Sequence, residues 1–318
     1  MRGYFITPIP QDAIMTRIAL CSFAPLLAAL LGSSALAPSA WSQGAPLAGV
    51  AEALGRSGAE QPGGVTRFSF PRSDLAVVAD SVTLKPAFAL GSWVAFLPIG
   101  NGAAMAMGDL VLTEDEVGPV MRALQAGGVE QSALHNHVLQ ESPRVMYMHI
   151  HAHGDPVKIA QTIRTALAQS RTPTGTPAAP APTTASDLDT ATIAGVLGIH
   201  GKLNGTVYQV SVPRRERITE NGHEIPPSMG VATAINFQPI GGGRAAVTGD
   251  FVMRAEEVNR VIRALQANGI TPTALHSHLL EESPRLFFMH FWARADATTL
   301  ARGLRAALDQ TASKMASK

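Results

Sequence analysis

The stretch Ala133-Leu-His-Asn-His-Val-Leu-Gln-Glu-Ser-Pro-Arg144 decides the fold of this chain, because it occurs twice. It returns as Ala274-Leu-His-Ser-His-Leu-Leu-Glu-Glu-Ser-Pro-Arg285, with nine of the twelve positions identical. Each copy runs on into a second histidine-bearing segment, so that eight of the ten histidines lie in the two copies. Self-similarity at one long, fixed offset indicates an internal duplication.

The duplication extends beyond the histidines. Arg122-Ala-Leu-Gln-Ala126 returns as Arg263-Ala-Leu-Gln-Ala267, and Gly108-Asp109 returns as Gly249-Asp250. We expect two homologous units, each near the size at which a domain can bury its own core. Between them the chain is rich in Pro, Thr, Ala and Ser, which is typical of an extended linker. The expected limits are 50–167 for the first unit, 168–190 for the linker, 191–311 for the second unit and 312–318 for a tail.

Residues 1–43 are predicted to be a secretory signal peptide with an upstream extension. Arg17 precedes an apolar run from Ile18 to Leu31, and Ala35-Leu-Ala37 supplies small residues for cleavage. These three features together are typical of a signal peptide, and the run is too short for a membrane-spanning helix. We expect cleavage between residues 37 and 43 and a periplasmic or secreted protein without a transmembrane segment.

Composition narrows the classes of partner. Cys21 lies inside the predicted signal, so the mature chain offers no thiolate ligand. Leu20 before it is not small, which makes Cys21 a poor site for a lipid anchor. Lys+Arg 25 against Asp+Glu 24 leaves no basic block of the kind that binds nucleic acid. The expected partner is a small molecule or a metal ion, and the oligomeric state stays open.

The patterning predicts an α+β fold with the order β-β-β-α-β-β-α in each unit. Thr113-Glu-Asp-Glu116 is a capping box that begins one helix, and Asp155-Pro156 begins another. The second unit repeats these helices from Ala255 and from Asp296. We expect an antiparallel or mixed sheet with two helices on one face. The predicted strands of the first unit are residues 65–71, 92–98, 103–112, 132–139 and 144–153.

The two histidine-bearing segments of each copy are predicted to form a β-hairpin. Side chains alternate along a strand, so His135 and His137 share a face. A tight turn centred on residue 142 would pair His135 with His149 and His137 with Tyr147. A slip by one residue would set polar faces against apolar ones. The copy is expected to have the same register, and one arrangement that fits is face-to-face packing of the two units about a pseudo-two-fold axis.

Three imidazoles on one patch have the composition of a site for zinc or another transition metal. The predicted ligands are His135, His137, His149, His276, His278 and His290. The candidates for a fourth ligand or a general base are Glu141 and Glu282. The candidates for binding a small ligand are Arg144, Arg285 and Tyr147.

Other polar positions allow more than one interpretation. Asp109 and Asp250 each follow a glycine within a strand, which fits a partner for a histidine or a bulge. The outer histidines of the first copy are not repeated in the second. His151 corresponds to Trp292, and His153 corresponds to Arg294. The two units therefore need not do the same job.

Three classes of function stay open from the residues alone. The first is a soluble exported protein that binds a transition metal or a small ligand at the histidine hairpins. The second is a metal-dependent hydrolase or oxygenase, in which a glutamate acts as base toward a metal-bound water. The third is a metal-free interaction or scaffold module of the cell envelope.

The repeated His-Asn/Ser-His-x-Leu-x-Glu-Ser-Pro-Arg motif, with the Gly-Asp strand and the Arg-Ala-Leu-Gln-Ala helix, resembles the LppY/LpqO family. These are exported bacterial proteins and lipoproteins built from a duplicated domain of unknown function. The resemblance covers about residues 50 to 309 and implies export and duplication. It implies no activity and no catalytic residue.

Overall fold

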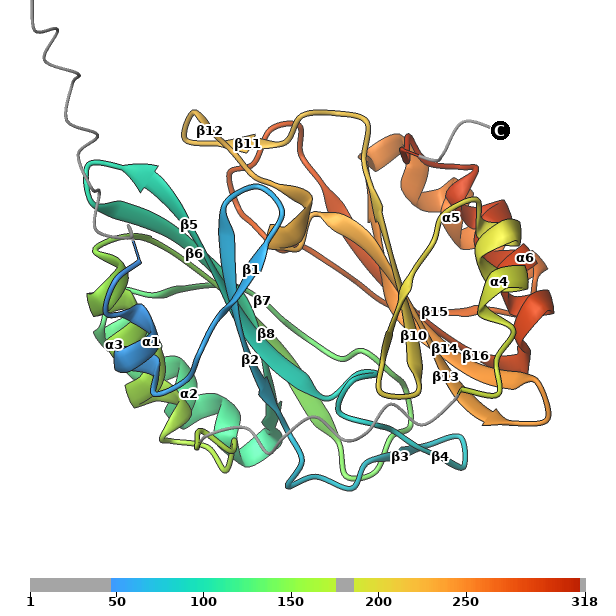
Figure 1. Cartoon of the computed structure of the whole chain (residues 1–318), viewed down its shortest axis with the longest axis horizontal. Coiled ribbons are helices and arrows are strands. Elements are labelled where there is room, and N and C mark those ends of the chain that lie inside the picture. Colours follow the sequence, from blue (N-terminus) through green and yellow to red (C-terminus); the bar gives the residue numbers. More distant parts are fainter. Residues whose placement is uncertain (1–46, 176–185, 315–318) are drawn as a thin grey trace, which may run out of the picture. The chain divides into compact units, whose positions relative to one another are not determined.

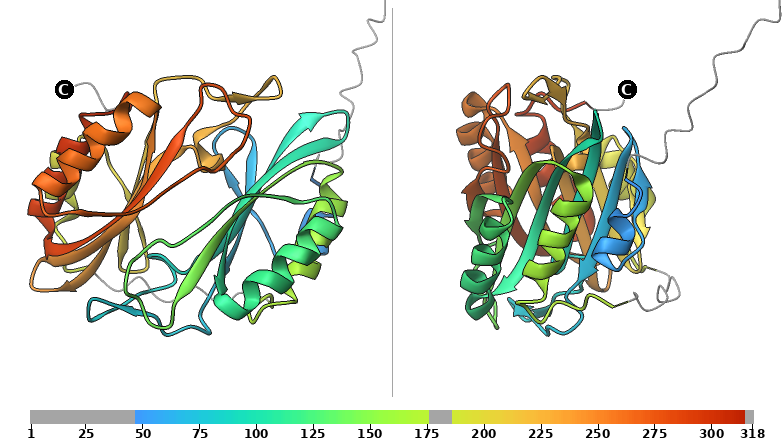
Figure 2. Two further views of the ribbon diagram at one scale, coloured as in Figure 1. Left: turned by 180° about the vertical axis from the view of Figure 1, so that it is seen from behind. Right: turned by 90° about the vertical axis from the view of Figure 1, so that its left-hand side faces the viewer.

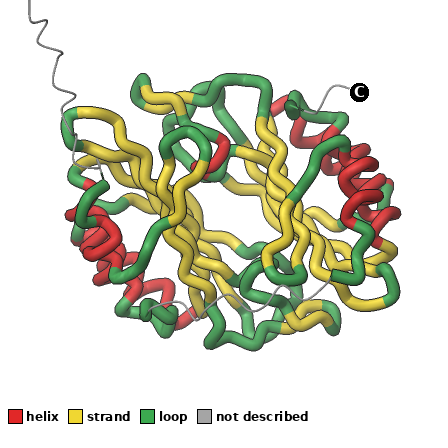
Figure 3. The backbone as a smooth tube through the Cα atoms, viewed as in Figure 1, coloured by secondary structure: helices red, strands yellow, loops and turns green. Residues whose placement is uncertain are grey.

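The computed structural model of this chain describes residues 47–175 and 186–314 (Figure 1). The predicted signal peptide, the middle of the predicted linker and the end of the tail lie outside the described residues. Within the described part, each repeat forms its own six-stranded sheet with helices (Figure 3). The predicted α+β class is confirmed, and the duplication is visible in the order of the elements.

The first sheet has the strand order β1-β2-β5-β6-β8-β7, and every neighbouring pair is antiparallel. Its strands are β1 (Ala59–Gln61), β2 (Val65–Pro71), β5 (Gly91–Gly100), β6 (Ala103–Thr113), β7 (Glu130–His135) and β8 (Val145–Gly154). Its helices are α1 (Val50–Leu54), α2 (Glu114–Ala126) and α3 (Pro156–Leu167). The predicted order of strands and helices is thus present, and the structure adds β1 and α1.

The second sheet repeats this order as β15-β16-β14-β13-β10-β9, again antiparallel throughout. Its strands are β9 (Lys202–Asn204), β10 (Val207–Pro213), β13 (Ala232–Gly241), β14 (Arg244–Met253), β15 (Thr271–His276) and β16 (Phe287–Asp296). Its helices are α4 (Thr190–Leu197), α5 (Ala255–Ala267) and α6 (Ala297–Leu308). The short elements outside the sheets are β3 (Val78–Ala79), β4 (Val82–Thr83), β11 (Thr219–Glu220), β12 (His223–Glu224) and the 3-10 turn η1 (Pro227–Met229).

The helices begin where local chemistry satisfies their free N–H groups. At α2, the Glu116 carboxylate accepts from the backbone N–H of Thr113 at 2.9 Å, which confirms the predicted capping box. At α3, Asp155 accepts from the N–H of Val157 at 2.9 Å, and Pro156 occupies the first turn. Both predicted helix starts of the first repeat are therefore confirmed.

A buried arginine joins each sheet to its first long helix. Arg72 follows β2 and is fully buried, and its guanidinium donates to the Val111 carbonyl at 2.6 Å and to Glu116 at 2.8 Å. In the second repeat, Arg214 forms the same bonds to Val252 and Glu257. Because Glu116 also caps α2, one carboxylate fixes both the start of the helix and the end of the strand.

Each sheet has helices on one face and the other repeat on the opposite face (Figure 2). Alternation along β8 decides which residues face which way, since Met148 and Ile150 pack under the helices of the first repeat. The inner faces of both sheets contribute to one apolar cluster, in which Met105 and Met107 pack with Phe288. The histidine-bearing face of each hairpin is therefore the face between the repeats.

The hairpin register differs from the prediction. His135 lies opposite Tyr147 and Ala133 lies opposite His149, so the predicted pairing of His135 with His149 was wrong by two residues. The second repeat shows the same shift, with His276 opposite Phe288. A shift of two keeps every side chain on its predicted face, so the histidines still share one side of the sheet.

The shift has a physical cause in the segment between the strands. β7 ends at His135, and the chain does not turn tightly at residue 142. Pro143 has no N–H to donate to a ladder, and Ser142 instead exchanges two backbone hydrogen bonds of 2.9 Å with Val78 at the β3–β4 hairpin. The predicted strand over 132–139 is therefore shorter at its end, and residues 136–144 form a loop.

Candidate metal centre

The six predicted histidine ligands form a single cluster between the two sheets. The closest pairs of imidazole rings come from different repeats. The ring centroids are 3.8 Å apart for His135 and His276, 3.7 Å for His137 and His290, and 3.8 Å for His149 and His278. The duplication maps the contact of His137 with His290 onto that of His278 with His149, and it maps the contact of His135 with His276 onto itself. The histidines are thus arranged about a pseudo-two-fold axis, as the face-to-face arrangement predicts.

Reciprocal hydrogen bonds hold the two His-x-His segments against each other. The Ser132 hydroxyl donates to the carbonyl of His278, and the corresponding hydroxyl of Thr273 donates to the carbonyl of His137. The side-chain amide of Asn136 also donates to the Thr273 carbonyl at 3.1 Å. Since these bonds hold the backbone carbonyls of His137 and His278, they position imidazoles that lie beyond the ends of their strands.

Two aspartates complete the cluster. Asp109 on β6 lies directly opposite His149, and Asp250 on β14 lies opposite His290. Both lie in regularly paired stretches, so the bulge that we considered for them is not present. A Cβ at Gly108 would lie 2.6 Å from the Trp93 carbonyl, so only glycine allows β6 to approach β5 next to Asp109.

The carboxylates lie within reach of the imidazoles. Asp250 Oδ2 is 2.8 Å from His278 Nε2 and 3.8 Å from His276 Nε2. The Nε2 atoms of His276 and His278 are themselves 3.1 Å apart. In the first repeat, Asp109 Oδ2 is 3.4 Å from His137 Nε2. Each carboxylate therefore lies close to imidazoles of its own repeat.

Much of the polar capacity of this cluster is unpaired. Among the described residues, seven buried atoms of the cluster have no hydrogen-bond partner. They are Nε2 of His135, His137, His149 and His290, Nδ1 of His276, and Oδ1 of Asp109 and Asp250. Buried polar atoms in folded proteins are nearly always bonded, so each unpaired atom requires an explanation. A bound cation is one group that would satisfy several unpaired acceptors of one cluster at once.

The remaining ring nitrogens orient the imidazoles. Nδ1 of His290 lies 2.7 Å from the Gly249 carbonyl, and Nδ1 of His278 lies 2.9 Å from the Gly230 carbonyl. A carbonyl can only accept, so these Nδ1 atoms carry the proton and Nε2 keeps its lone pair. Outer hydrogen bonds of this kind fix the tautomer and direction of metal-binding histidines.

Several groups in the cluster could hold a metal ion. Their ligand atoms lie within 4.8 Å of one another in three combinations: His135 with His276 and His290, His149 with His276 and His278, and Asp109 with His135 and His137. Two of these combinations mix ligands from both repeats. Imidazole and carboxylate donors suit zinc and other first-row transition ions.

Burial keeps four imidazoles of the cluster neutral. It lowers the pKa of His137, His149 and His290 well below the usual range, and neighbouring imidazoles add to the effect. Burial also lowers the pKa of His278 to about 3. It raises the pKa of Asp250 well above its usual range, and the nearby Asp109 carboxylate adds to that rise. Neutral imidazole is the form that ligates metals.

The predicted glutamates lie at the loops of the hairpins. Glu141 is buried, and its carboxylate accepts from the N–H of Val145 at 3.4 Å. Glu282 accepts from the N–H of Leu286 at 2.8 Å. Neither belongs to a group of described residues that could hold a metal. Their contacts stabilise the loop, and a role as general base stays a prediction.

The predicted small-ligand residues divide between the cluster and the surface. The Tyr147 ring stacks on His137 at 3.2 Å between centroids, and its hydroxyl donates to the Ala89 carbonyl at 3.0 Å. Arg144 is exposed, 4.0 Å from the Glu114 carboxylate. Arg285 is exposed too, and it donates to the Leu280 carbonyl at 3.0 Å. The structure therefore brings Tyr147 to the histidines but not the arginines.

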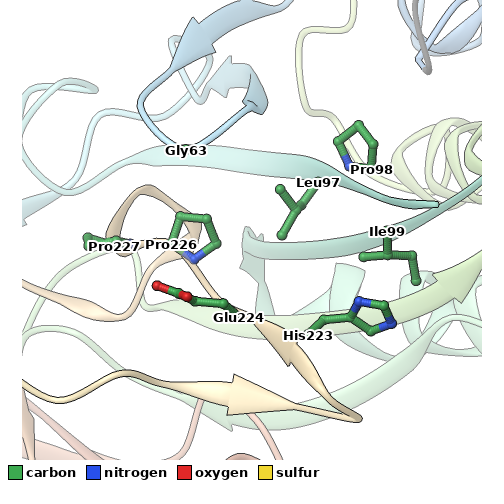
Figure 4. Close-up of a pocket in the computed structure, with 8 residues that line it drawn as sticks. All are labelled: Gly63, Leu97, Pro98, Ile99, His223, Glu224, Pro226 and Pro227. Atoms are coloured by element: carbon green, nitrogen blue, oxygen red, sulfur yellow. The ribbon is translucent and has the colours of Figure 1, made fainter. Parts of the chain in front are cut away.

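A separate open cleft of about 450 Å³ lies elsewhere between the repeats (Figure 4). β5 contributes Leu97, Pro98 and Ile99 to its walls, and β12 contributes His223 and Glu224. None of the six clustered histidines lines it. The cluster is a buried centre, and the cleft is an apolar groove with one imidazole and one carboxylate at its edge.

The fold and the cluster together define a duplicated α+β protein with histidines and aspartates buried between its halves. The chain matches the family model described as Domain of Unknown Function (DUF1259) at residues 48–169 and again at 191–310, so the protein belongs to this family and contains its domain twice. No curated protein matches the chain significantly. In the described part, no helix has the length and apolar character needed to cross a membrane.

One solved structure was also found to be similar, the crystal structure of a trimeric bacterial microcompartment shell protein PduB. The identity is 13%, and the match covers 80% of this chain and 89% of that one. The TM-score is 0.20, which is too low to bear on the fold or function of this protein.

Proposed function

We propose that this protein binds a transition metal at the cluster of histidines and aspartates shared by its repeats. The observation that carries this proposal is that seven buried atoms of the cluster have no hydrogen-bond partner among the described residues, while groups of its side chains lie within 4.8 Å of one another. An unpaired buried polar atom costs about 1–3 kcal/mol. A metal ion would satisfy several of these atoms at once.

We infer two adjoining half-sites, each with one ligand from the other repeat, and the group of His135, His276 and His290 joins them. One comprises Asp109, His135, His137 and His290, and the other comprises Asp250, His276, His278 and His149. Three nitrogens and one carboxylate are a donor set for Zn²⁺ and related divalent ions. A bound cation would also favour the charged form of Asp250, which burial opposes.

Metal analysis of the purified mature chain, produced without a polyhistidine tag, tests this proposal. We expect near-stoichiometric metal in the parent, and much less in a His276→Ala, His278→Ala variant. A His200→Ala variant is the matched control, because His200 is exposed and lies outside the cluster. A parent that contains no metal, and whose melting temperature does not rise with Zn²⁺, Cu²⁺, Ni²⁺ or Mn²⁺, would overturn the proposal.

We further infer that the protein is exported and is a member of the LppY/LpqO family. The apolar run from Ile18 to Leu31 and the small residues after it support export. The repeated His-x-His motif supports the family. We place the units at 50–167 and 191–311, joined by a linker over 168–190. Fractionation of expressing cells, with sequencing of the mature N-terminus, tests the export directly.

A further inference from the structure

A second group of metal-binding side chains lies outside the central cluster. His151 and His153 follow His149 on the same face of β8. Their exposure rises outward along the strand, from 3% at His149 to a 28% exposed side chain at His153. The second repeat contributes Glu220 from β11, whose Oε2 lies 2.8 Å from His151 Nε2 and 3.5 Å from His153 Nε2.

This contact is not a satisfied hydrogen bond. Although they are only 2.8 Å apart, His151 Nε2 and Glu220 Oε2 are both buried without a hydrogen-bond partner among the described residues. Their orientation does not suit a donor and an acceptor. Two atoms that are close but not bonded to each other are expected where both bind a third atom.

We propose that His151, His153 and Glu220 form a second site for a divalent transition metal ion, separate from the central cluster. Their ligand atoms lie within 4.8 Å of one another. Two imidazoles and one carboxylate are the protein ligands of many zinc sites that keep one coordination position open. This open position distinguishes the site from the more deeply buried central one.

The surroundings of the site fit a bound ion. Met105 and Met107 lie directly opposite His153 and His151 on β6 and belong to a buried apolar cluster, so one side of the site is apolar. His223 lies directly opposite Glu220 in the β11–β12 pair. His223 also lines the cleft of Figure 4, and the partly exposed side chain of His153 connects the site with solvent.

The other repeat provides an internal comparison at the equivalent place. The four residues His151, His153, Glu220 and His223 correspond in the duplication to Trp292, Arg294, Ala79 and Val82. There the Arg294 guanidinium pairs with Asp80 at 2.6 Å, and Trp292 packs edge-on against Phe88 at 6.1 Å. At one of the two equivalent positions, an ion pair and an aromatic contact fill the space. At the other, the side chains are of types that ligate metals.

Zinc titration of the full mature chain by calorimetry tests the site. The variants are His153→Gln, Glu220→Gln and the combination His276→Ala, His278→Ala, with His200→Gln as the control. We expect one zinc ion to remain bound when the central histidines are changed. We expect His153→Gln or Glu220→Gln to weaken that ion at least about tenfold, as loss of a supporting or ligating group does. His200→Gln should change nothing.

The titration results distinguish the second site from the central cluster. If the central cluster binds no metal, the parent should still bind one zinc ion that depends on His153 and Glu220. If all zinc disappears with the central histidines, in a variant whose circular dichroism shows a folded protein, the second site does not exist. Zinc binding that is unchanged in His153→Gln and in Glu220→Gln would overturn it equally. Because the His153 side chain is partly exposed, His153→Gln keeps the test valid should Glu220→Gln fail to fold.

Discussion

At Asp250, burial and metal binding act in opposite directions. Burial raises the pKa of this carboxyl well above its usual range, although Oδ2 lies 2.8 Å from His278 Nε2. Oδ1 has no hydrogen-bond partner among the described residues. Without a cation, the carboxylate is therefore an unfavourable group at this position. Under the proposed function, a bound cation would offset this cost.

Asp250→Asn should separate the two effects. The amide has the same shape without the charge, so we expect the metal-free protein to be as stable as the parent or more stable. Zinc affinity should fall by about 10- to 100-fold or more, the range for loss of a supporting group. Thermal melting and zinc titration measure both quantities, with Asp187→Asn at an exposed position as the control. Unchanged zinc affinity would contradict a ligand role for Asp250.

Glu141 gives a pH dependence of the opposite kind to that of the histidines. Burial raises its pKa from 4.5 to about 7. Between these values the folded state holds a proton that the unfolded state has released, so the stability of the metal-free protein falls as the pH rises from about 4.5 to about 7. Glu141→Gln should remove this loss, which is on the order of 1–3 kcal/mol.

The buried histidines with lowered pKa values, His137, His149, His278 and His290, are expected to change stability in the same range, with the opposite sign. Their lowered pKa values mean that stability is lost as the pH falls below the usual histidine value of about 6.5. The comparison of parent and Glu141→Gln by urea unfolding, at pH 5 and at pH 7 with chelator present, cancels this contribution. If the difference between the two proteins is the same at both pH values, the Glu141 carboxyl does not titrate in this range.

At the scale of elements, local chemistry made most of the fold predictable. The capping box at Thr113 and the Asp155-Pro156 cap lie within a few residues of the helices they begin, so the sequence alone locates them. The hairpin register depends on a distant partner instead. Ser142 bonds to Val78, and no local pattern indicates this pairing. The predicted faces were correct because a shift of two residues preserves alternation.

The buried ion pair of Arg72 and Glu116 joins the end of β2 to the start of α2, and it was not predicted from the sequence. Glu116→Gln removes the charge that offsets a fully buried guanidinium, while Asp74 remains at 2.8 Å. We expect a loss of about 3 kcal/mol in the free energy of unfolding. Glu114→Gln is the matched control on the same helix, and its exposed side chain should contribute less than about 0.5 kcal/mol.

Urea unfolding of both variants decides the role of this pair. Their zinc content should equal that of the parent, because Arg72 and Glu116 lie outside the central cluster. Equal stability of Glu116→Gln and Glu114→Gln would show that Asp74 alone offsets the charge of Arg72.

At the scale of the whole molecule, the repeats complete each other. The sequence predicted all six histidines of the cluster and a face-to-face arrangement, but not which imidazoles meet. That depends on side chains 153 positions apart, such as His137 and His290, whose ring centroids are 3.7 Å apart. The partner of His151 was missed for the same reason, since Glu220 belongs to the other repeat. Nothing within one copy encodes a contact with the other.

This arrangement predicts a specific pattern of coupling across the repeats. If His137 and His290 ligate the same ion, either single alanine variant removes that site. The double variant should then lose little further zinc affinity. His137 and His149 belong to the same repeat but to different proposed half-sites, so their effects should add. A double-mutant cycle for each pair, measured by zinc titration of the full chain, makes the comparison. If His137 instead couples to His149 and is additive with His290, each repeat binds its metal alone, and the exchange of ligands between repeats is wrong.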